Sequence, residues 1–177
     1  MIEFKELNKS EKSSFLPLLF DIFYNNTIEL APSEKSYELQ RDEWLSEVSP
    51  ALDKEPRKVI LCYSDGELAG FLMYYTRGEL LMVEELQLKK KFQRTRAFYM
   101  LCKHFISVLP REIATVEAYA LKNNFNSQGI MQYLGMEFVP HEIGFPLVHL
   151  RGSAEKIKER FCAEYSQICS AKNVVIS

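Results

Sequence analysis

The amino-acid sequence predicts one α/β domain, of the α+β kind, in which helices cover both faces of a mixed, mostly antiparallel sheet of six to seven strands. Two observations carry this prediction. Apolar residues alternate with a period of two in several short segments, and they recur at helical spacing in others. The strands of residues 58–88 follow one another as a meander, whereas a helix separates strand 80–88 from strand 113–121. That helix predicts a right-handed crossover between two parallel strands.

Composition limits the classes of function. The chain has 177 residues, 47% hydrophobic and 26% charged, with a formal net charge of −2. This suits a single domain over residues 1–177, with residues 151–177 as a C-terminal helical extension. No apolar run approaches the roughly 18 residues of a membrane span, and the four cysteines lack zinc-like spacing. We therefore expect a cytoplasmic monomer or homodimer with no metal, no nucleic-acid partner and no membrane partner.

The first part of the chain predicts one strand and two helices. Ile2 and Phe4 alternate with charged residues, as in a short strand. Residues 8–11 (NKSE) resemble a capping box and open an apolar helix that ends at the two asparagines 25 and 26. A second helix covers residues 37–48 and stops before Pro50, because proline interrupts the helical hydrogen bonds.

A meander of three strands follows. Asp65-Gly66 and Arg77-Gly78 are turn signals between apolar runs. The strands that they separate cover residues 58–64, 68–76 and 80–88.

The second half of the chain returns to helical spacing. Ala97, Leu101 and Phe105 predict a helix that Pro110 stops, and Gly135 is placed to end a shorter helix. The remaining predicted elements are strand 113–121, helix 126–134, strands 136–139 and 145–150, and helix 153–170.

Two motifs lie where such a fold often carries function. Residues 93–98 (QRTRAF) join the central strand to the next helix. They can be compared with a loop pattern [Q/R]-x-x-G-x-[G/A], in which Gln93 occupies the first position. Residues 124–136 (NFNSQGIMQYLGM) follow the form N-x-x-A-x-x-x-Y-x-x-x-G-F, with Asn124, Ser127 and Gly135 in register. With the element order, these motifs resemble the GNAT family of N-acetyltransferases over roughly residues 1–150. Arg96 and Phe98 replace small residues of the family pattern.

The resemblance implies acetyl-CoA as the cofactor and a small-molecule or peptide amine as the acceptor. It implies that the pyrophosphate lies against the start of the helix, where free backbone N–H groups favour anions. It also implies that the amide near Leu88 polarises the thioester carbonyl. The residues expected to bind the cofactor are Leu88, Gln93, Arg94, Thr95, Arg96, Ala97, Phe98 and Asn124.

The loop departs from the family in having side-chain charge where the family has glycine. Guanidinium and ammonium groups can bind phosphate directly, so charge can replace a close backbone fit. The alternative is a solvated basic turn that binds nothing. The basic residues in question are Lys89, Lys90, Lys91, Arg94 and Arg96.

Two adjacent acids on the central strand are the candidate catalytic bases. Glu85 is preferred to Glu84, and the alternative is that one acid faces solvent while the other pairs with Lys or Arg. Met131 stands where many family members have a tyrosine general acid, and it cannot donate a proton. Tyr99, Tyr119 and Tyr133 are the remaining candidate acids.

Two functions follow from the sequence. The first is an N-acetyltransferase that moves an acetyl (acyl) group from acetyl-CoA to an amine. The second is a catalytically impaired GNAT-like domain that acts as a ligand-binding or regulatory module.

Overall fold

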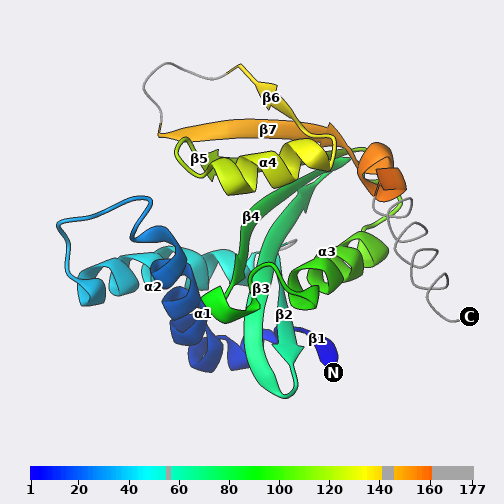
Figure 1. The fold of residues 1–177 in the computed structure, drawn as a ribbon. Coiled ribbons are helices and arrows are strands. Elements are labelled where there is room, and N and C mark those ends of the chain that lie inside the picture. Colours follow the sequence, from blue (N-terminus) through cyan, green and yellow to red (C-terminus); the bar gives the residue numbers. More distant parts are fainter. Residues whose placement is uncertain (55–56, 141–145, 161–177) are drawn as a thin grey trace, which may run out of the picture. The chain divides into compact units, whose positions relative to one another are not determined.

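The computed structural model describes residues 1–54, 57–140 and 146–160 (Figure 1). The strands are β1 (Ile2–Glu6), β2 (Lys58–Ser64), β3 (Glu67–Arg77), β4 (Leu80–Leu88), β5 (Thr115–Leu121), β6 (Glu137–Val139) and β7 (Leu147–Ser153). The helices are α1 (Lys12–Thr27), α2 (Tyr37–Asp53), α3 (Arg96–Val108) and α4 (Phe125–Tyr133), with short 3-10 helices η1 (Lys9–Glu11) and η2 (Lys90–Phe92).

The sheet confirms the predicted fold class. Its seven strands follow the order β1-β2-β3-β4-β5-β7-β6. The pairs β1–β2, β2–β3, β5–β7 and β6–β7 are antiparallel. The parallel pairing of residues 80–88 with residues 113–121 stays a prediction. None of the helices in the described ranges is long and apolar enough to cross a membrane.

The chain divides into two compact units. The first comprises Met1–Arg77 and Leu81–Leu109, and the second comprises Gly78–Leu80 and the chain from Pro110 onward.

In the first unit, helices cover both faces of β2 and β3. Leu16, Leu19 and Ile22 of α1 pack with alternate residues of β2 and β3, such as Leu61 and Phe71. On the other face, α3 packs through a stacked pair and an edge-on pair of rings. These pairs are Phe4–His104, with ring centroids 4.4 Å apart, and Tyr74–Phe105, with centroids 5.3 Å apart. Successive side chains of β2 and β3 point to opposite faces of the sheet, and apolar residues lie on both faces, so each face can pack against a helix.

Helix α2 is longer than the sequence predicts. It continues through Pro50 to Asp53, so the expected stop before Pro50 is wrong. The added turn places Leu52, only 5% exposed, in the core cluster, and places Asp53 against Lys12 at 2.6 Å. The stabilisation from the burial of Leu52 and from this ion pair offsets the cost of the helical hydrogen bond that Pro50 removes.

The second unit is built on β5 and β7, which pair residue by residue from Thr115↔Ser153 to Leu121↔Leu147. This pairing moves the predicted strand 145–150 to Leu147–Ser153, so the following helix begins later, and residues 154–160 are helical. The rest of the predicted helix, residues 161–170, lies outside the described residues, as does Phe145. Gly135 has a φ of +90° directly after α4, which confirms the predicted helix end.

Candidate active site

Glu84 forms an ion pair with an arginine that sequence analysis did not identify. Arg57, just before β2, donates through Nε at 2.6 Å and through Nη2 to the two carboxylate oxygens of Glu84. Both side chains are 22% exposed, and the guanidinium group also lies over the Tyr75 ring at 5.2 Å. A bidentate pair of this kind gives Glu84 a structural role, because it joins β4 to the start of β2. The expected arrangement, in which one acid pairs with Lys or Arg, therefore describes Glu84.

Glu85 lies in a different environment. Burial raises the pKa of the Glu85 carboxyl group to about 7; the Gln87 amide opposes this rise and the charge of Glu84 adds to it. Gln87 donates through Nε2 to Glu85 Oε2 at 2.8 Å. A carboxyl group with a pKa near neutrality can release and accept a proton under ordinary conditions, which suits a general base. Of the two adjacent acids, Glu85 is the one whose pKa is raised, and its role as the base stays a prediction.

A chain of amides connects Glu85 to the loop after β4. Asn26, in the last turn of α1, donates through Nδ2 to Gln87 Oε1 at 2.9 Å and to the Leu88 carbonyl at 2.8 Å. Gln93 donates through Nε2 to Asn26 Oδ1 at 3.0 Å and to the same carbonyl at 3.1 Å. We call Asn26, Gln87 and Gln93 the amide network.

The end of β4 stays bonded to β3 through the residue that follows Leu88. The Lys89 amide donates to the Ala69 carbonyl of β3 at 2.9 Å. Because N–H and C=O groups alternate in direction along a strand, those of Leu88 point away from β3. The Leu88 carbonyl there accepts from the amide network. An amide that polarises a thioester carbonyl, as predicted for Leu88, must point away from β3 in this way.

The loop of residues 93–98 leads into α3 through a strained residue. Arg94 has a φ of +59°, in the left-handed region that favours glycine. Thr95 is the N-cap of α3, and its Oγ1 accepts from the Ala97 amide at 3.2 Å. Arg94, Thr95 and Arg96 are exposed, Ala97 is buried and Phe98 is partly buried. The helix therefore begins where a pyrophosphate site is predicted, but one of its first amides is already bound by Thr95.

The basic residues of the loop fall into two groups. Lys89 and Lys91 both pair with Glu67, at 3.1 and 2.6 Å, and Lys90 pairs with Glu29 at 2.8 Å. Within residues 1–54, 57–140 and 146–160, no ion pair involves Arg94 or Arg96. Since Lys89, Lys90 and Lys91 already have carboxylate partners, the two arginines are the better candidates to bind an anion.

A cavity of about 440 Å³ adjoins the amide network. Its volume is in the range of small-ligand sites. It is lined by apolar and polar side chains of α1, by Leu68, and by residues 89 and 90 after β4. Asn26 belongs to its wall, and Asp21 of the same wall accepts from the Tyr37 hydroxyl group. This cavity lies within the first unit, beside the loop that the sequence assigns to the cofactor.

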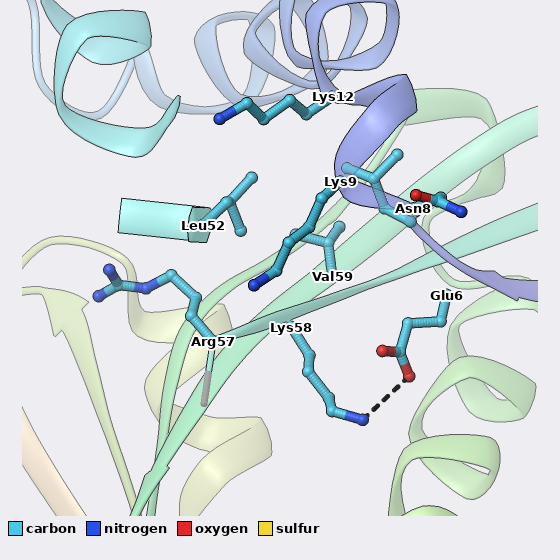
Figure 2. A pocket seen from close by; sticks show the side chains of 9 residues that line it. Glu6, Asn8, Lys9, Lys12, Leu52, Arg57, Lys58 and Val59 are labelled. Carbon is cyan, nitrogen blue, oxygen red and sulfur yellow. Dashed lines mark hydrogen bonds and ion pairs between the residues drawn. The ribbon is translucent and has the colours of Figure 1, made fainter. Parts of the chain in front are cut away.

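A second cavity, of about 330 Å³, is lined by basic side chains, with Lys9, Lys12, Arg57 and Lys58 around it (Figure 2). Acidic groups compensate much of this charge: Lys58 pairs with Glu6 at 3.2 Å, and Lys12 and Arg57 have the partners described above. These pairs join the ends of β1 and α2 to the starts of α1 and β2. These structural ion pairs account for the gathering of basic side chains around the cavity.

Tyr99, a candidate acid, lies in α3 of the first unit, and the other remaining candidates belong to the second unit. Asn124 is the N-cap of α4, and its Oδ1 accepts from the Ser127 amide at 3.1 Å. Met131 lies in α4, and Tyr133, at its end, is 54% exposed. Tyr119 stacks on His149, with ring centroids 4.6 Å apart. The second motif thus has a local structural role in forming α4, and the cofactor contact of Asn124 stays a prediction.

No protein-family model matches the chain, and no curated protein sequence matches it. Solved structures do. The PaiA N-acetyltransferase of Thermoplasma acidophilum, solved with coenzyme A, has a TM-score of 0.68 and 13% identity, covering 86% of this chain and 99% of that one. The ribosomal-protein-S18-alanine N-acetyltransferase of Escherichia coli has a TM-score of 0.64 and 14% identity, with coverage of 87% and 94%. A GNAT-family acetyltransferase of Staphylococcus aureus has a TM-score of 0.64 and 13% identity, with coverage of 87% and 99%.

The chain has the GNAT fold. The similarity extends over nearly the whole length of these acetyltransferases, so the predicted fold class is confirmed. At these identities the comparison establishes architecture, and function must be argued from the site.

Sequence analysis missed Arg57, Asn26 and Gln87. Asn26 had been interpreted only as the end of a helix, yet it contacts residues 61 and 62 positions further along the chain. No local pattern marks such a contact, because it depends on how α1 packs against the sheet.

Proposed function

We propose that this chain is an N-acetyltransferase that transfers an acetyl group from acetyl-CoA to an amine, with Glu85 as the general base. The observation that carries the proposal is the chain of hydrogen bonds that runs from the partly buried Glu85 carboxyl group, through Gln87 and Asn26, to Gln93 in the loop after β4. Desolvation raises the pKa of this carboxyl group to about 7. The GNAT fold supports the proposal. The sequence resemblance to that family implies that the loop after β4 binds the cofactor.

The chemistry assigned to Glu85 is the removal of one proton. When the amine nitrogen forms a bond to the acetyl carbon and the carbon–sulfur bond breaks, the amine must lose a proton and the thiolate must gain one. Ionised Glu85 takes the amine proton, directly or through a water. The same negative charge attracts an ammonium ion to the site before deprotonation. The thiolate can take its proton from solvent.

The loop can hold an acyl-CoA through side chains. Acetyl-CoA would supply the acetyl group as a thioester. Arg94 and Arg96 offer guanidinium groups to the pyrophosphate, and α3 adds the positive end of its dipole. The Leu88 amide points away from β3, in the direction proposed for the thioester carbonyl. Because Thr95 occupies the Ala97 amide, the site depends more on the arginines than a glycine loop would.

The decisive test is Glu85→Gln, assayed for acetyl transfer to a panel of amines. We expect turnover to fall roughly 10²-fold or more at neutral pH, while affinity for coenzyme A changes little. The deficit should shrink at high pH, where more of the amine is already neutral. Normal turnover in the Glu85→Gln variant would remove Glu85 as the base.

The Thr95–Ala97 contact also supports a second candidate, a GNAT-like ligand-binding or regulatory module without catalysis. Such a module would gain thermal stability on addition of acetyl-CoA, since a ligand bound only to the folded state stabilises it. It would acetylate none of the amines. Turnover by the native chain excludes this candidate.

A further inference from the structure

The amide network extends the site beyond the two acids and the loop. Five hydrogen bonds between 2.8 and 3.1 Å connect Glu85, Gln87, Asn26, Gln93 and the Leu88 carbonyl. Its members come from three segments: β4, the last turn of α1, and the loop before α3. All of them lie in the first unit.

The Leu88 carbonyl sets the direction of every bond in the network. A carbonyl oxygen can only accept, so the groups of Asn26 and Gln93 that face it must be their NH2 groups. The Asn26 NH2 group also faces Gln87, so Gln87 must present its oxygen to Asn26. The NH2 group of Gln87 is then left to face Glu85, where it donates at 2.8 Å.

We propose that Asn26 and Gln87 are positioning residues: together they hold the NH2 group of Gln87 on the Glu85 carboxyl group and connect that group, through Gln93, to the cofactor loop. Their importance for turnover rests on the proposed function, whereas the orientation of the amides does not. A donor fixed on a carboxylate favours its ionised form, which is the form that accepts a proton. The network therefore opposes the effect of burial and keeps Glu85 usable as a base near neutral pH.

Among the described residues, no positively charged group is a cause of the Glu85 pKa shift, so an amide, Gln87, stabilises the charged form of Glu85. On β4 itself the neighbouring charge is Glu84, which is paired with Arg57. From α1, the side chain that reaches this part of β4 is the neutral Asn26, and the carboxylate of Asp21 is engaged by the Tyr37 hydroxyl group. Gln87 is thus the group that stabilises the charged form of Glu85.

The test is a titration of the Glu85 side-chain carboxyl carbon by NMR in the full chain without substrate. Its signal is assigned by its loss in Glu85→Gln. We expect Asn26→Ala and Gln87→Leu each to raise the midpoint by about half a unit to one unit, which corresponds to one hydrogen bond. Asn26→Asp should raise it further, because a carboxylate cannot donate to Gln87 and adds a negative charge. Asn25→Ala is the matched control, since the Asn25 side chain bonds only the Asp21 carbonyl of its own helix in the described structure.

An unchanged midpoint in folded Asn26→Ala and Gln87→Leu proteins would overturn the proposal, as would an equal shift in Asn25→Ala. Thermal melting shows whether each variant is folded. Because the titration needs no acetyl transfer, it gives its result even if the proposed function fails. If the protein is active, the pH profile of kcat/KM should move upward in Asn26→Ala by the same amount as the NMR midpoint.

Discussion

Arg94 combines a left-handed backbone, with a φ of +59°, and an exposed side chain suited to phosphate. Glycine adopts this conformation without the steric cost that other residues bear. The family pattern that the sequence resembles uses glycines in this loop, whereas this chain has arginines. A strained non-glycine residue at a predicted binding loop is a reason to test function there.

Two substitutions at Arg94 separate side-chain charge from backbone strain. Arg94→Ala and Arg94→Gly both remove the guanidinium group, but only glycine relieves the strain. We expect Arg94→Gly to be more stable than Arg94→Ala by about 1 kcal/mol in denaturant unfolding.

Binding of coenzyme A to these variants, measured by calorimetry, tests the proposed role of charge. Both should lose about 1–3 kcal/mol of binding free energy if Arg94 contacts the pyrophosphate. Arg41→Ala, in α2, removes an arginine that pairs with Asp42, and it should leave binding unchanged. Full affinity in Arg94→Gly would show that the backbone, not the arginine, makes the site.

At the residue level, local sequence could place the two candidate acids on β4, and the role of Glu85 as the base stays a prediction. The preference for Glu85 over Glu84 could be made because both acids lie on a short apolar strand before the loop, and the structure gives Glu85 the raised pKa. The roles of Arg57 and Asn26 could not be predicted, because their partners are 27 and 61 residues away in the chain. Charge counting likewise did not reveal that the three lysines of the loop have glutamate partners.

At the scale of elements, the end of β4 is shaped by an irregularity in β3. The pairing of β2 with β3 shifts between Cys62↔Gly70 and Tyr63↔Leu68, which leaves Ala69 as an extra residue. The Ala69 carbonyl then accepts from the Lys89 amide at 2.9 Å. Bulges of this kind change the direction of a strand, and they are common beside active sites. Strand boundaries could be predicted from alternation, but a bulge inside an apolar run leaves no such signal.

Gly70 allows this close approach. A Cβ atom at position 70 would lie 2.2 Å from the Gln87 carbonyl oxygen and 2.8 Å from the Leu88 Cα atom. We therefore expect Gly70→Ala to push the end of β4 aside and to cost about 1–3 kcal/mol of unfolding free energy. Turnover should fall further than stability, because Glu85 and Leu88 move with the strand.

Gly129 provides a control of opposite sign. It lies within α4, and, apart from its chain neighbours and the backbone of its own helix, no described atom comes within 4 Å of an added Cβ. Gly129→Ala should stabilise the protein by about 0.5–1 kcal/mol, because alanine is the better helix former. Equal melting temperatures for Gly70→Ala and the native chain would show that β4 does not approach β3 as described.

For the whole molecule, the fold class could be predicted because it depends on the order and period of the elements. The extension of α2 through Pro50 could not, since it depends on the burial of Leu52 in a core assembled from distant segments. Partial burial of Glu85 in the same unit has a consequence for the stability of the protein. The folded carboxyl group has a pKa of about 7, compared with an ordinary value of 4.5.

This difference between the pKa of Glu85 in the folded protein and its ordinary value predicts how the effect of Glu85→Gln on unfolding free energy depends on pH. Between pH 4.5 and 7 the folded state holds a proton that the unfolded state has released, so unfolding free energy falls as pH rises through that window. At pH 8 the native chain bears the cost of a partly buried carboxylate, at most roughly 3 kcal/mol, and glutamine does not. Glu85→Gln should thus match the native chain at pH 4 and exceed it progressively up to pH 8, as measured by urea unfolding at each pH. Glu3→Gln, at an exposed position on β1, should show no such trend. A constant difference between the Glu85→Gln and native chains across this range would mean that Glu85 titrates as an ordinary surface carboxylate, and it would lose its claim to be the base.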